Sequence, residues 1–357
     1  MATRQSGLFL GLSVNALLRA MGWVPTAELT EAESASTLFR FFRSQHVRDL
    51  KLIFTAALFV FLSHLAIVLL VGVGTAVHSM FLPDRPPGLG NQIFAALAEF
   101  FSFIIRYIGP GIPIYGAIIG WAYLSASSRL GVVDLFASEI GTLCRVGTIF
   151  DIGARWVDAY AAPEKFSGSG KFVSEEDYFP VFESNSRDLQ VLEATVVNYI
   201  AEFYSYMKAL RDAMRRLAET KPPVPAAPSV QARDPKSEPD AWHAAMLNVI
   251  YLVYLAYESA RKAVRELVEF QPAKAERLIV ILLTELKCYA FLRSHFDPGD
   301  LRYRRLQLRA AEYKEEVPQI YRQVMSQGPN DKDWLQARET IEELAMRYKE
   351  ALGEDLV

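Results

Sequence analysis

Residues 52–77 read LIFTAALFVFLSHLAIVLLVGVGTAV, a stretch that contains no charged side chain. A helix needs about 20 apolar residues to cross the roughly 30 Å of hydrocarbon in a bilayer, so this stretch predicts a first transmembrane helix. The apolar core of a cleaved signal peptide is shorter and lies nearer the chain start. A buried core helix of a soluble domain is the alternative, and the length of the stretch argues against it.

A second apolar region is interrupted by GPGIP at residues 109–113. Before the interruption, residues 91–108 read NQIFAALAEFFSFIIRYI and include Glu99 and Arg106, whereas the following IYGAIIGWAYLSASS carries no charge. Because a charge inside a span is costly, we predict an interfacial or re-entrant helix over 91–108 and a second transmembrane helix over about 109–128. The alternative is one long, kinked crossing that starts near residue 93.

Basic residues flank both predicted spans and set the expected orientation. They are Arg40, Arg43, Arg48 and Lys51 before the first span, and Arg129 and Arg145 after the second. The connection at 78–90 contains only Arg85. Since Lys and Arg are enriched on the cytoplasmic side, we expect both termini in the cytoplasm and 78–90 as a short outer loop.

Composition agrees with a small membrane part joined to a larger water-soluble part. Hydrophobic residues make up 51% of the 357 residues, yet 22% are charged, too many for a chain that lies wholly in a bilayer. The net charge of −3 lacks the basic surplus typical of nucleic-acid-binding proteins, so no nucleic acid is expected as a partner. Cys144 and Cys288 form no CxxC pair, which favours a reducing compartment.

The remaining chain is predicted to be helical, with no segment of strand period. The expected parts are an N-terminal cytoplasmic arm at 1–51, a membrane domain at 52–128, a juxtamembrane helix at 129–161, a linker and heptad-patterned helix at 162–221, a Pro-rich linker at 222–240 and a C-terminal helical domain at 241–357. Within the arm, residues 7–24 are predicted either to lie on the bilayer surface or to pack on the soluble domain. Glycines at 131, 141, 147 and 153 either weaken the juxtamembrane helix or permit close packing against another helix.

Apolar residues alternate at spacings of three and four along the heptad-patterned helix, for which Ser184 or Asn185 is the expected N-cap. They are Leu189, Leu192, Val196, Tyr199, Phe203, Tyr206, Leu210, Ala213 and Leu217. Such a seam forms either a coiled-coil contact between chains or an ordinary helical bundle within one chain, and its tyrosines favour the bundle.

Helices are also predicted near 241–270, 274–296, 300–326 and 332–352, separated by Pro and Gly breaks. The charge-free start of the first, 241–257, is shorter than the about 20 residues that a crossing needs. A buried core helix is therefore favoured over a third span.

Candidate functional residues fall into three groups. Gly116 and Gly120 form a GxxxG pattern that Ser128 extends, which is typical of close helix association either between chains or within one. The intramembrane or interfacial polar residues are His64, Glu99 and Arg106. The charged juxtamembrane residues are Asp134, Glu139 and Arg145, which are expected to be solvated or paired, or to contact another subunit.

The common catalytic, metal-binding and dinucleotide-binding motifs do not occur in the sequence. The segment SGSGKF at 167–172 lacks the first glycine and the Ser or Thr of a phosphate-binding loop. We therefore predict no catalytic residue, metal ligand or cofactor. The arginines at 302, 304, 305 and 309 are interpreted as a solvated helix face rather than an anionic-lipid or nucleic-acid patch, because Glu312, Glu315 and Glu316 follow.

Two stretches, GWAYLSASSRLGVVDLFASEIGTLCRV and YFPVFESNSRDLQVLEATVVNYIAEFYSYMKALRD, resemble uncharacterised bacterial inner-membrane proteins with two spans and a helical cytoplasmic tail. The resemblance covers about residues 50–220 and implies a bacterial inner-membrane location. It implies no activity.

The sequence thus predicts an all-α membrane protein with two transmembrane helices, an interfacial helix and a cytoplasmic helical bundle. The favoured function is a scaffold or sensor that presents its cytoplasmic helices to a protein partner or to copies of itself. The alternatives are an oligomeric pore or permeability effector, suggested by the broken GPGIP segment, and an enzyme with a site near the juxtamembrane acids.

Overall fold

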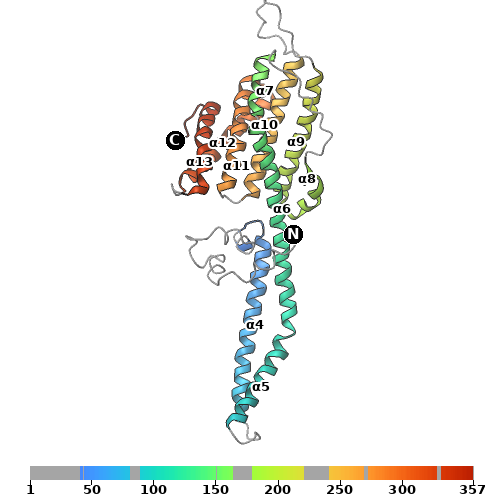
Figure 1. The fold of residues 1–357 in the computed structure, drawn as a ribbon, viewed down its shortest axis with the longest axis vertical. Helices are drawn as coiled ribbons and strands as arrows, with labels where there is room; N and C mark the ends of the chain where they lie inside the picture. Colours follow the sequence, from blue (N-terminus) through green and yellow to red (C-terminus); the bar gives the residue numbers. More distant parts are fainter. Residues whose placement is uncertain are drawn as a thin grey trace, which may run out of the picture. The chain divides into compact units, whose positions relative to one another are not determined.

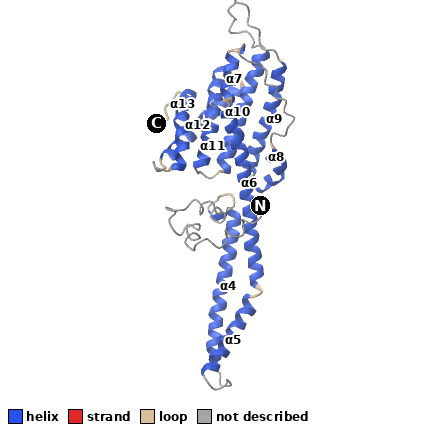
Figure 2. Ribbon diagram, in the orientation of Figure 1, coloured by secondary structure: helices blue, strands red, loops and turns tan. Residues whose placement is uncertain are grey.

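The computed structural model describes residues 41–42, 44–80, 89–149, 151–163, 179–220, 241–268, 272–327 and 331–356. Regular structure in these residues is helical and includes no strand, which confirms the all-α prediction (Figure 1 and Figure 2). The chain divides into an N-terminal unit, Met1–Gly131, and a C-terminal unit, Val132–Val357. Most of the expected arm and outer loop, part of the linker before the heptad-patterned helix and the Pro-rich linker lie outside the described residues.

The N-terminal unit contains α4 (Arg48–Met80), α5 (Leu89–Ile108) and the first part of α6 (Gly111–Ile149). Helices α4 and α5 lie side by side (Figure 1). They approach closely at Gly72, where an added Cβ would lie 3.2 Å from the Phe100 ring and 3.3 Å from that of Phe103. A glycine in α4 therefore makes room for two rings of α5.

Aromatic and charged contacts fix the start of α4 to α6. The buried residues of this small core are Phe41, Phe42, Val47, Leu50, Ala126 and Leu130. Beside them, the Arg129 guanidinium donates to Asp49 over 2.9 Å and to the backbone carbonyl of His46 over 3.0 Å. Lys51 Nζ donates to the carbonyl of Phe42 over 2.7 Å. Two of the basic residues that flank the predicted spans, Lys51 and Arg129, are thus bonded at the end where α4 begins.

Helix α6 begins at Gly111, within the GPGIP interruption, and continues without a break to Ile149, well beyond the predicted end of the second span. Ile93–Ile108 and the helical stretch that follows Gly111 are bent by 46° relative to each other. The juxtamembrane helix predicted over 129–161 is interrupted at Asp151, whose φ of 46° places it in the left-handed region. Helix α7 (Ile152–Ala161) starts after that residue.

The C-terminal unit is a helical bundle built around α10 (Ala241–Leu267). Helices α7, α9 (Ala194–Glu219) and α11 (Pro272–His295) pack on α10, and α13 (Lys332–Leu352) packs on α11. Helix α12 (Leu301–Met325) contacts α11 and α13. In α10, Trp242, Met246 and Val249 belong to the core, so its charge-free start is the buried core helix that the sequence favoured.

The predicted seam lies within a single chain. Val196, Phe203, Leu210 and Leu217 of α9 are buried in the same core as α10, and the two helices pack along each other. The described contacts therefore agree with the bundle interpretation of the seam, and a coiled coil between chains stays a prediction.

The expected N-cap of this helix is wrong. Ser184 and Asn185 end the short helix α8 (Pro180–Asn185), and a 3-10 helix, Ser186–Val191, follows. Pro180 occupies the first turn of α8, where its missing N–H costs no hydrogen bond. Leu192 is then extended, so α9 begins at Ala194 with Glu193 as its N-cap.

Candidate functional site

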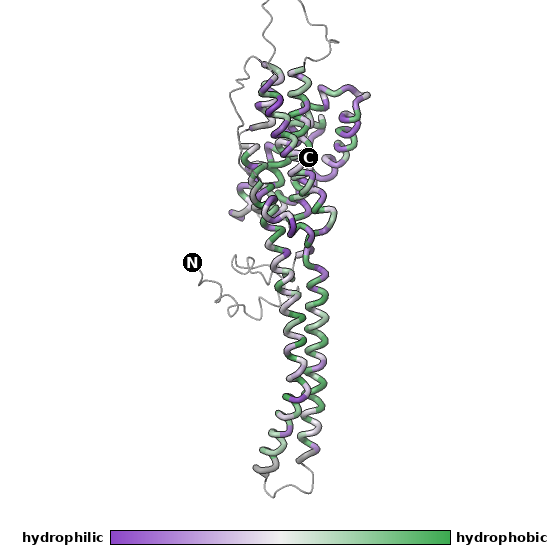
Figure 3. The backbone as a smooth tube through the Cα atoms, turned by 90° about the vertical axis from the view of Figure 1, so that its right-hand side faces the viewer, coloured by the Kyte–Doolittle hydropathy of each residue, from purple (hydrophilic) through white to green (hydrophobic). Residues whose placement is uncertain are grey.

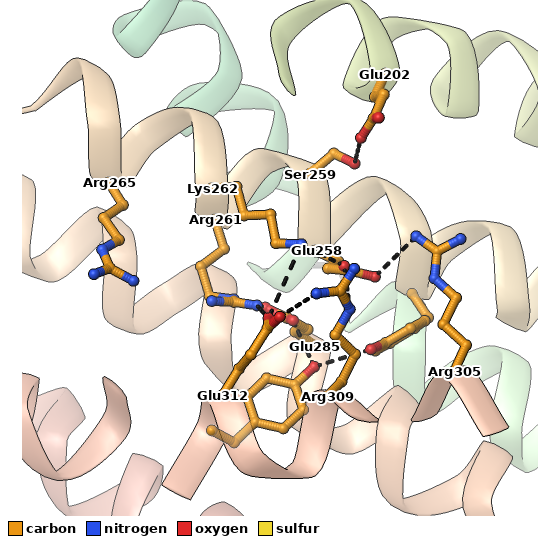
Figure 4. Close-up of polar contacts among 12 residues, drawn as sticks. Glu202, Glu258, Ser259, Arg261, Lys262, Arg265, Glu285, Arg305, Arg309 and Glu312 are labelled. Atoms are coloured by element: carbon orange, nitrogen blue, oxygen red, sulfur yellow. Dashed lines mark hydrogen bonds and ion pairs between the residues drawn. The ribbon is translucent and has the colours of Figure 1, made fainter. Parts of the chain in front are cut away.

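A polar pocket of about 560 Å³ lies between α9, α10 and α12 of the C-terminal unit. The residues that line it are Tyr199, Glu202, Arg261, Lys262, Arg265, Glu266, Arg305, Arg309, Glu312, Glu315, Glu316 and Gln319. Figure 4 shows part of this wall, with side chains of α10 and α12 facing each other. Unlike the core below it, this space is lined mainly by ions.

Helical spacing places the charges on facing surfaces. In α10, Glu258 is followed by Arg261, Lys262 and Arg265 at intervals of three or four residues, so these side chains share one face. In α12, the same intervals separate the residues at 305, 309, 312 and 316. Each helix thus carries acids and bases that meet the opposite charges of the other.

Arg261 occupies the floor of the pocket and contacts three carboxylates. Its Nε donates to Glu285 over 2.8 Å and its Nη1 donates to Glu316, while Nη2 lies 3.5 Å from Glu312. The side chains of Arg261 and Glu285 are 1% and 0% exposed. Such a charge is tolerated in a core only when its partners are in place.

Glu258 is the second buried acid of the cluster and is shared by three cations. Lys262 Nζ and Arg309 Nε each lie 2.8 Å from its Oε1, and Arg305 Nη2 lies 3.5 Å from its Oε2. We call Glu258, Arg261, Lys262, Glu285, Arg305, Arg309, Glu312 and Glu316 the charged cluster.

Burial and pairing change the ionisation of this cluster in opposite directions. Burial raises the pKa of Glu285 to about 7, although Arg261 and a hydrogen bond of 2.5 Å from Tyr313 oppose the rise. Burial also acts against ionisation of Glu312, but Lys262 and Arg309 hold its pKa below the usual value. Glu285 is thus placed to exchange a proton near neutral pH.

Four buried side-chain atoms of residues that line the pocket have no hydrogen-bond partner among the described residues. They are Nη2 of Arg261, Nε of Arg305, Nε of Arg309 and Oε1 of Glu316. Arg261 Nη2 still faces a carboxylate oxygen of Glu312 at ion-pair distance. The other oxygen of Glu316, Oε2, accepts a hydrogen bond from Arg261 Nη1 and lies 3.6 Å from Arg265 Nη1. Glu316 Oε1 is thus buried without a donor among the described residues.

The predicted helix-association residues are not brought against another helix. No atom of another described residue lies within 4 Å of a Cβ added at Gly116 or Gly120, and Ser128 is exposed. The close approach inside the N-terminal unit is made by Gly72 instead. Association between chains through the GxxxG face stays a prediction.

The polar residues predicted in the membrane region lie at separate positions. His64 is half-buried on α4; its ring is 6.3 Å from that of Tyr115, and it lies next to Gly111, where α6 begins. Glu99 and Arg106 are both exposed on α5. They do not form one site with His64 in the described contacts.

The predicted juxtamembrane charges contact different neighbours. The Glu139 carboxylate accepts hydrogen bonds from the backbone N–H groups of Val181 and Phe182, over 3.0 and 3.2 Å, and from the Tyr204 hydroxyl. It therefore satisfies the free N–H groups at the start of α8. Arg145 lies 3.9 Å from Glu276 of α11, and Asp134 is half-buried on α6. No group of three His, Cys, Asp or Glu suited to a metal occurs in the described part of the chain.

Sequence reasoning missed the charged cluster, although signals for it were present. Arg305 and Arg309 were interpreted as a solvated face, whereas both line the pocket and face Glu258. Glu285 is the single acid within ILLTELKCY, and Arg261 follows an almost uncharged run in α10. An isolated charge inside an apolar helix is typical of a buried, paired ion.

Comparisons with protein-family models, curated proteins and solved structures found no match to this chain. The fold and the pocket therefore define the class. The described residues are all-α and include one helix that is long and apolar enough to cross a membrane, or two crossings if the bent pair is one span, together with a helical unit that carries an ion-lined pocket.

Proposed function

We propose that this chain is a membrane-anchored sensor or scaffold of the bacterial inner membrane, whose N-terminal unit lies in the bilayer and whose C-terminal unit binds a ligand or protein partner in the cytoplasm. The observation that carries the proposal is the surface of α4. The most apolar 18-residue window of its Arg48–His78 stretch has a mean hydropathy of 2.6, yet only 11% of that window is buried. A helix that is apolar on all sides and unburied is suited to lipid.

The other helices of the N-terminal unit support the same environment. Phe94 and Ile105 of α5 are 77% and 71% exposed, and Leu124 of α6 is 68% exposed. In Figure 3 the helices of this unit are coloured mostly as hydrophobic. Apolar exposure over three adjacent helices far exceeds the isolated patches of a soluble surface.

Paired charges at the start of α4 support a membrane boundary and an orientation. Arg48, Lys51 and Arg129 lie at this end, and Arg129 pairs with Asp49. Because basic flanks favour the cytoplasmic side, this end faces the cytoplasm in our proposal, with both termini inside. The bent α5–α6 pair then supplies the return crossing as a broken span.

A matched pair of arginine substitutions tests the proposal. Leu70, in the middle of α4, and Leu308, on α12, are 77% and 75% exposed, so neither change disturbs a packed core. We expect the wild-type chain and Leu308→Arg to float with membranes after alkaline washing. Leu70→Arg should reduce the membrane fraction, because a central arginine costs about 2.5–3.5 kcal/mol of insertion free energy. Equal flotation of both variants, or no flotation of the wild type, would refute the proposal.

An oligomeric pore is a second candidate, favoured by one observation. Arg106 is exposed on α5 one turn before the bend, beside apolar residues that are also exposed. A cation at membrane depth needs a partner or water, which a second copy of the chain or an aqueous path supplies. Purified protein should then conduct ions across a planar bilayer, and an unchanged conductance in Arg106→Ala would count against a pore.

A further inference from the structure

Three cations and one acid lie together at the end of the N-terminal unit where α4 begins. Arg48 and Lys51 are one helical turn apart on α4, and Arg129 of α6 reaches the same end by pairing with Asp49 over 2.9 Å. Three cations against one acid give these side chains a net formal charge of +2. We call Arg48, Asp49, Lys51 and Arg129 the basic cluster.

The cations of the basic cluster keep hydrogen-bond donors that the described residues do not use. Both hydrogen bonds of the Arg129 side chain are donated by Nη1, which leaves the N–H groups of Nε and Nη2. The Lys51 ammonium has three N–H groups and donates one of them to the carbonyl of Phe42. Arg48 is exposed. Since charge-assisted hydrogen bonds to phosphate oxygens are strong, these groups are suited to a phosphate.

Exposed apolar side chains begin directly after the basic cluster. Leu52 and Ile53 follow Lys51 and are 71% and 39% exposed, and Phe59, two turns further along α4, is 72% exposed. A ligand at this end of α4 therefore meets positive charge first and an apolar helix surface next to it. A phosphate ion or a nucleic acid has no apolar part to place on that surface, whereas a phospholipid has both a charged headgroup and acyl chains.

The basic cluster has no counterpart at the other end of α4. Between Lys51 and Arg106 the sequence contains one further Lys or Arg, Arg85, which lies outside the described residues. The positive charge of the N-terminal unit is thus concentrated where α4 begins. In the orientation proposed above, this end meets the cytoplasmic leaflet, whose anionic lipids attract basic residues.

From these observations we propose that the basic cluster binds the headgroup of an anionic phospholipid, whose acyl chains lie against α4 at Leu52 and Ile53. The unused N–H groups of Arg129 and Lys51 donate to the headgroup phosphate, and Arg48 adds positive charge. Every phospholipid carries a phosphate, so the preference for an anionic one comes from the net charge of the cluster, which a zwitterionic headgroup does not neutralise. The inference rests on the proposed function, because it requires the N-terminal unit to lie in a bilayer.

Spin-labelled lipids test the proposal on the full chain reconstituted in phosphatidylcholine liposomes. Electron paramagnetic resonance measures how much of a chain-labelled phosphatidylglycerol, or of phosphatidylcholine labelled at the same carbon, is immobilised by the protein. We expect the protein to prefer phosphatidylglycerol about three-fold or more at low salt, because basic residues near the surface attract anionic lipid. The preference should decrease as sodium chloride screens the charges.

Matched variants locate this preference on the chain. Arg48→Gln with Lys51→Gln should bring the preference close to equal immobilisation of the two lipids. Arg304→Gln with Lys332→Gln, at exposed positions of α12 and α13, removes the same charge and should leave the preference unchanged. Arg48→Gln alone alters one exposed side chain and should lose part of the preference, which keeps the test decisive if the first double variant fails to fold.

The outcomes separate this proposal from that of the membrane anchor. Equal immobilisation of the two lipids by the wild type, or the same preference in both double variants, would overturn the lipid site while the chain remains anchored. Loss of the preference in sodium phosphate, at an ionic strength where sodium chloride preserves it, would also overturn it, because the cations would then bind a phosphate ion from solution. Immobilisation of neither lipid would refute the membrane anchor and the lipid site with it.

Discussion

Arg261 and Glu285 are 24 residues apart on neighbouring helices, and their side chains form a 2.8 Å ion pair from which solvent is almost wholly excluded. Glu316 contacts the same guanidinium from α12. One arginine thus connects three helices through charges rather than apolar contacts. A buried ion of this kind stabilises the fold only while all of its partners remain.

Removal of the arginine should destabilise the C-terminal unit severely. Arg261→Leu leaves Glu285 and Glu316 buried without a cation, and we expect the free energy of unfolding to fall by about 3–5 kcal/mol. Thermal unfolding in detergent, followed by circular dichroism, measures the loss. Arg347→Leu is the matched control, because Arg347 also contacts two acids, Glu343 and Glu350, but at the surface, where such pairs contribute about 0–1 kcal/mol. Similar losses in both variants would contradict the role given to burial.

Stability should decrease as pH rises from about 4.5 to about 7. The pKa of Glu285 is raised to about 7 in the folded chain from an ordinary value of about 4.5, so the folded state binds this proton more tightly than the unfolded state. Its stabilising contribution is complete below pH 4.5 and is lost as pH approaches 7, a change on the order of 3 kcal/mol. Unfolding measured across this range should show the fall in the wild type and a flatter profile in Glu285→Gln.

The opposite pH response is expected of Glu312. Lys262 and Arg309 lower its folded pKa despite partial burial, so its contribution is present above the unfolded pKa and is lost at lower pH. The two effects occupy different pH ranges, and Glu312→Gln should alter only the acidic one. If Glu285→Gln left the profile between pH 4.5 and 7 unchanged, the assignment to Glu285 would be wrong.

Glu139 should protect the backbone amides at the start of α8 from hydrogen exchange. Glu139→Ala removes the acceptor of two backbone N–H groups, at Val181 and Phe182, and of the Tyr204 hydroxyl. We expect a loss of about 2 kcal/mol in stability and faster hydrogen exchange at those two amides. Ser138→Ala, at an exposed neighbouring position, should leave both amides protected, and equal exchange in the two variants would refute the capping role.

Gly72 should be more sensitive to substitution than Gly74. An added Cβ meets the Phe100 ring at 3.2 Å in the first position and no atom within 4 Å in the second. Gly72→Val is therefore expected to separate α5 from α4 and to lower the melting temperature in detergent by several degrees, since overpacking costs about 1–3 kcal/mol. Gly74→Val is the control for valine itself, and an equal loss would show that α4 and α5 do not pack as described.

Local signals predicted most of the helices. The apolar stretch 52–77 lies within α4, and the predicted helices at 300–326 and 332–352 differ from α12 and α13 by at most one residue at each end. Helix ends set by proline or glycine, and helices set by an unbroken apolar stretch, depend on a few neighbouring residues. A single sequence is therefore enough to predict them. The start of α9 was missed because the chain first forms α8 and a 3-10 helix.

The pocket was not predictable in the same way. Glu258, Glu285 and Glu316 come from three helices, and only tertiary packing brings them to Arg261. Helical spacing shows that Arg305 and Arg309 share a face, but it does not show what that face contacts. The lone acid in ILLTELKCY was the strongest signal available, since an unpaired carboxylate is not stable in such a setting.

The central claim is that α4 lies in lipid, and spin labels can test it directly. Labels attached through Leu70→Cys and Leu308→Cys compare two positions of similar exposure, while Cys144 and Cys288 are buried thiols with raised pKa and should react little. In liposomes, power-saturation electron paramagnetic resonance should find the residue 70 label accessible to oxygen and shielded from a water-soluble nickel chelate, with the reverse at residue 308. Equal access of the nickel chelate to both labels would contradict the membrane-anchored account.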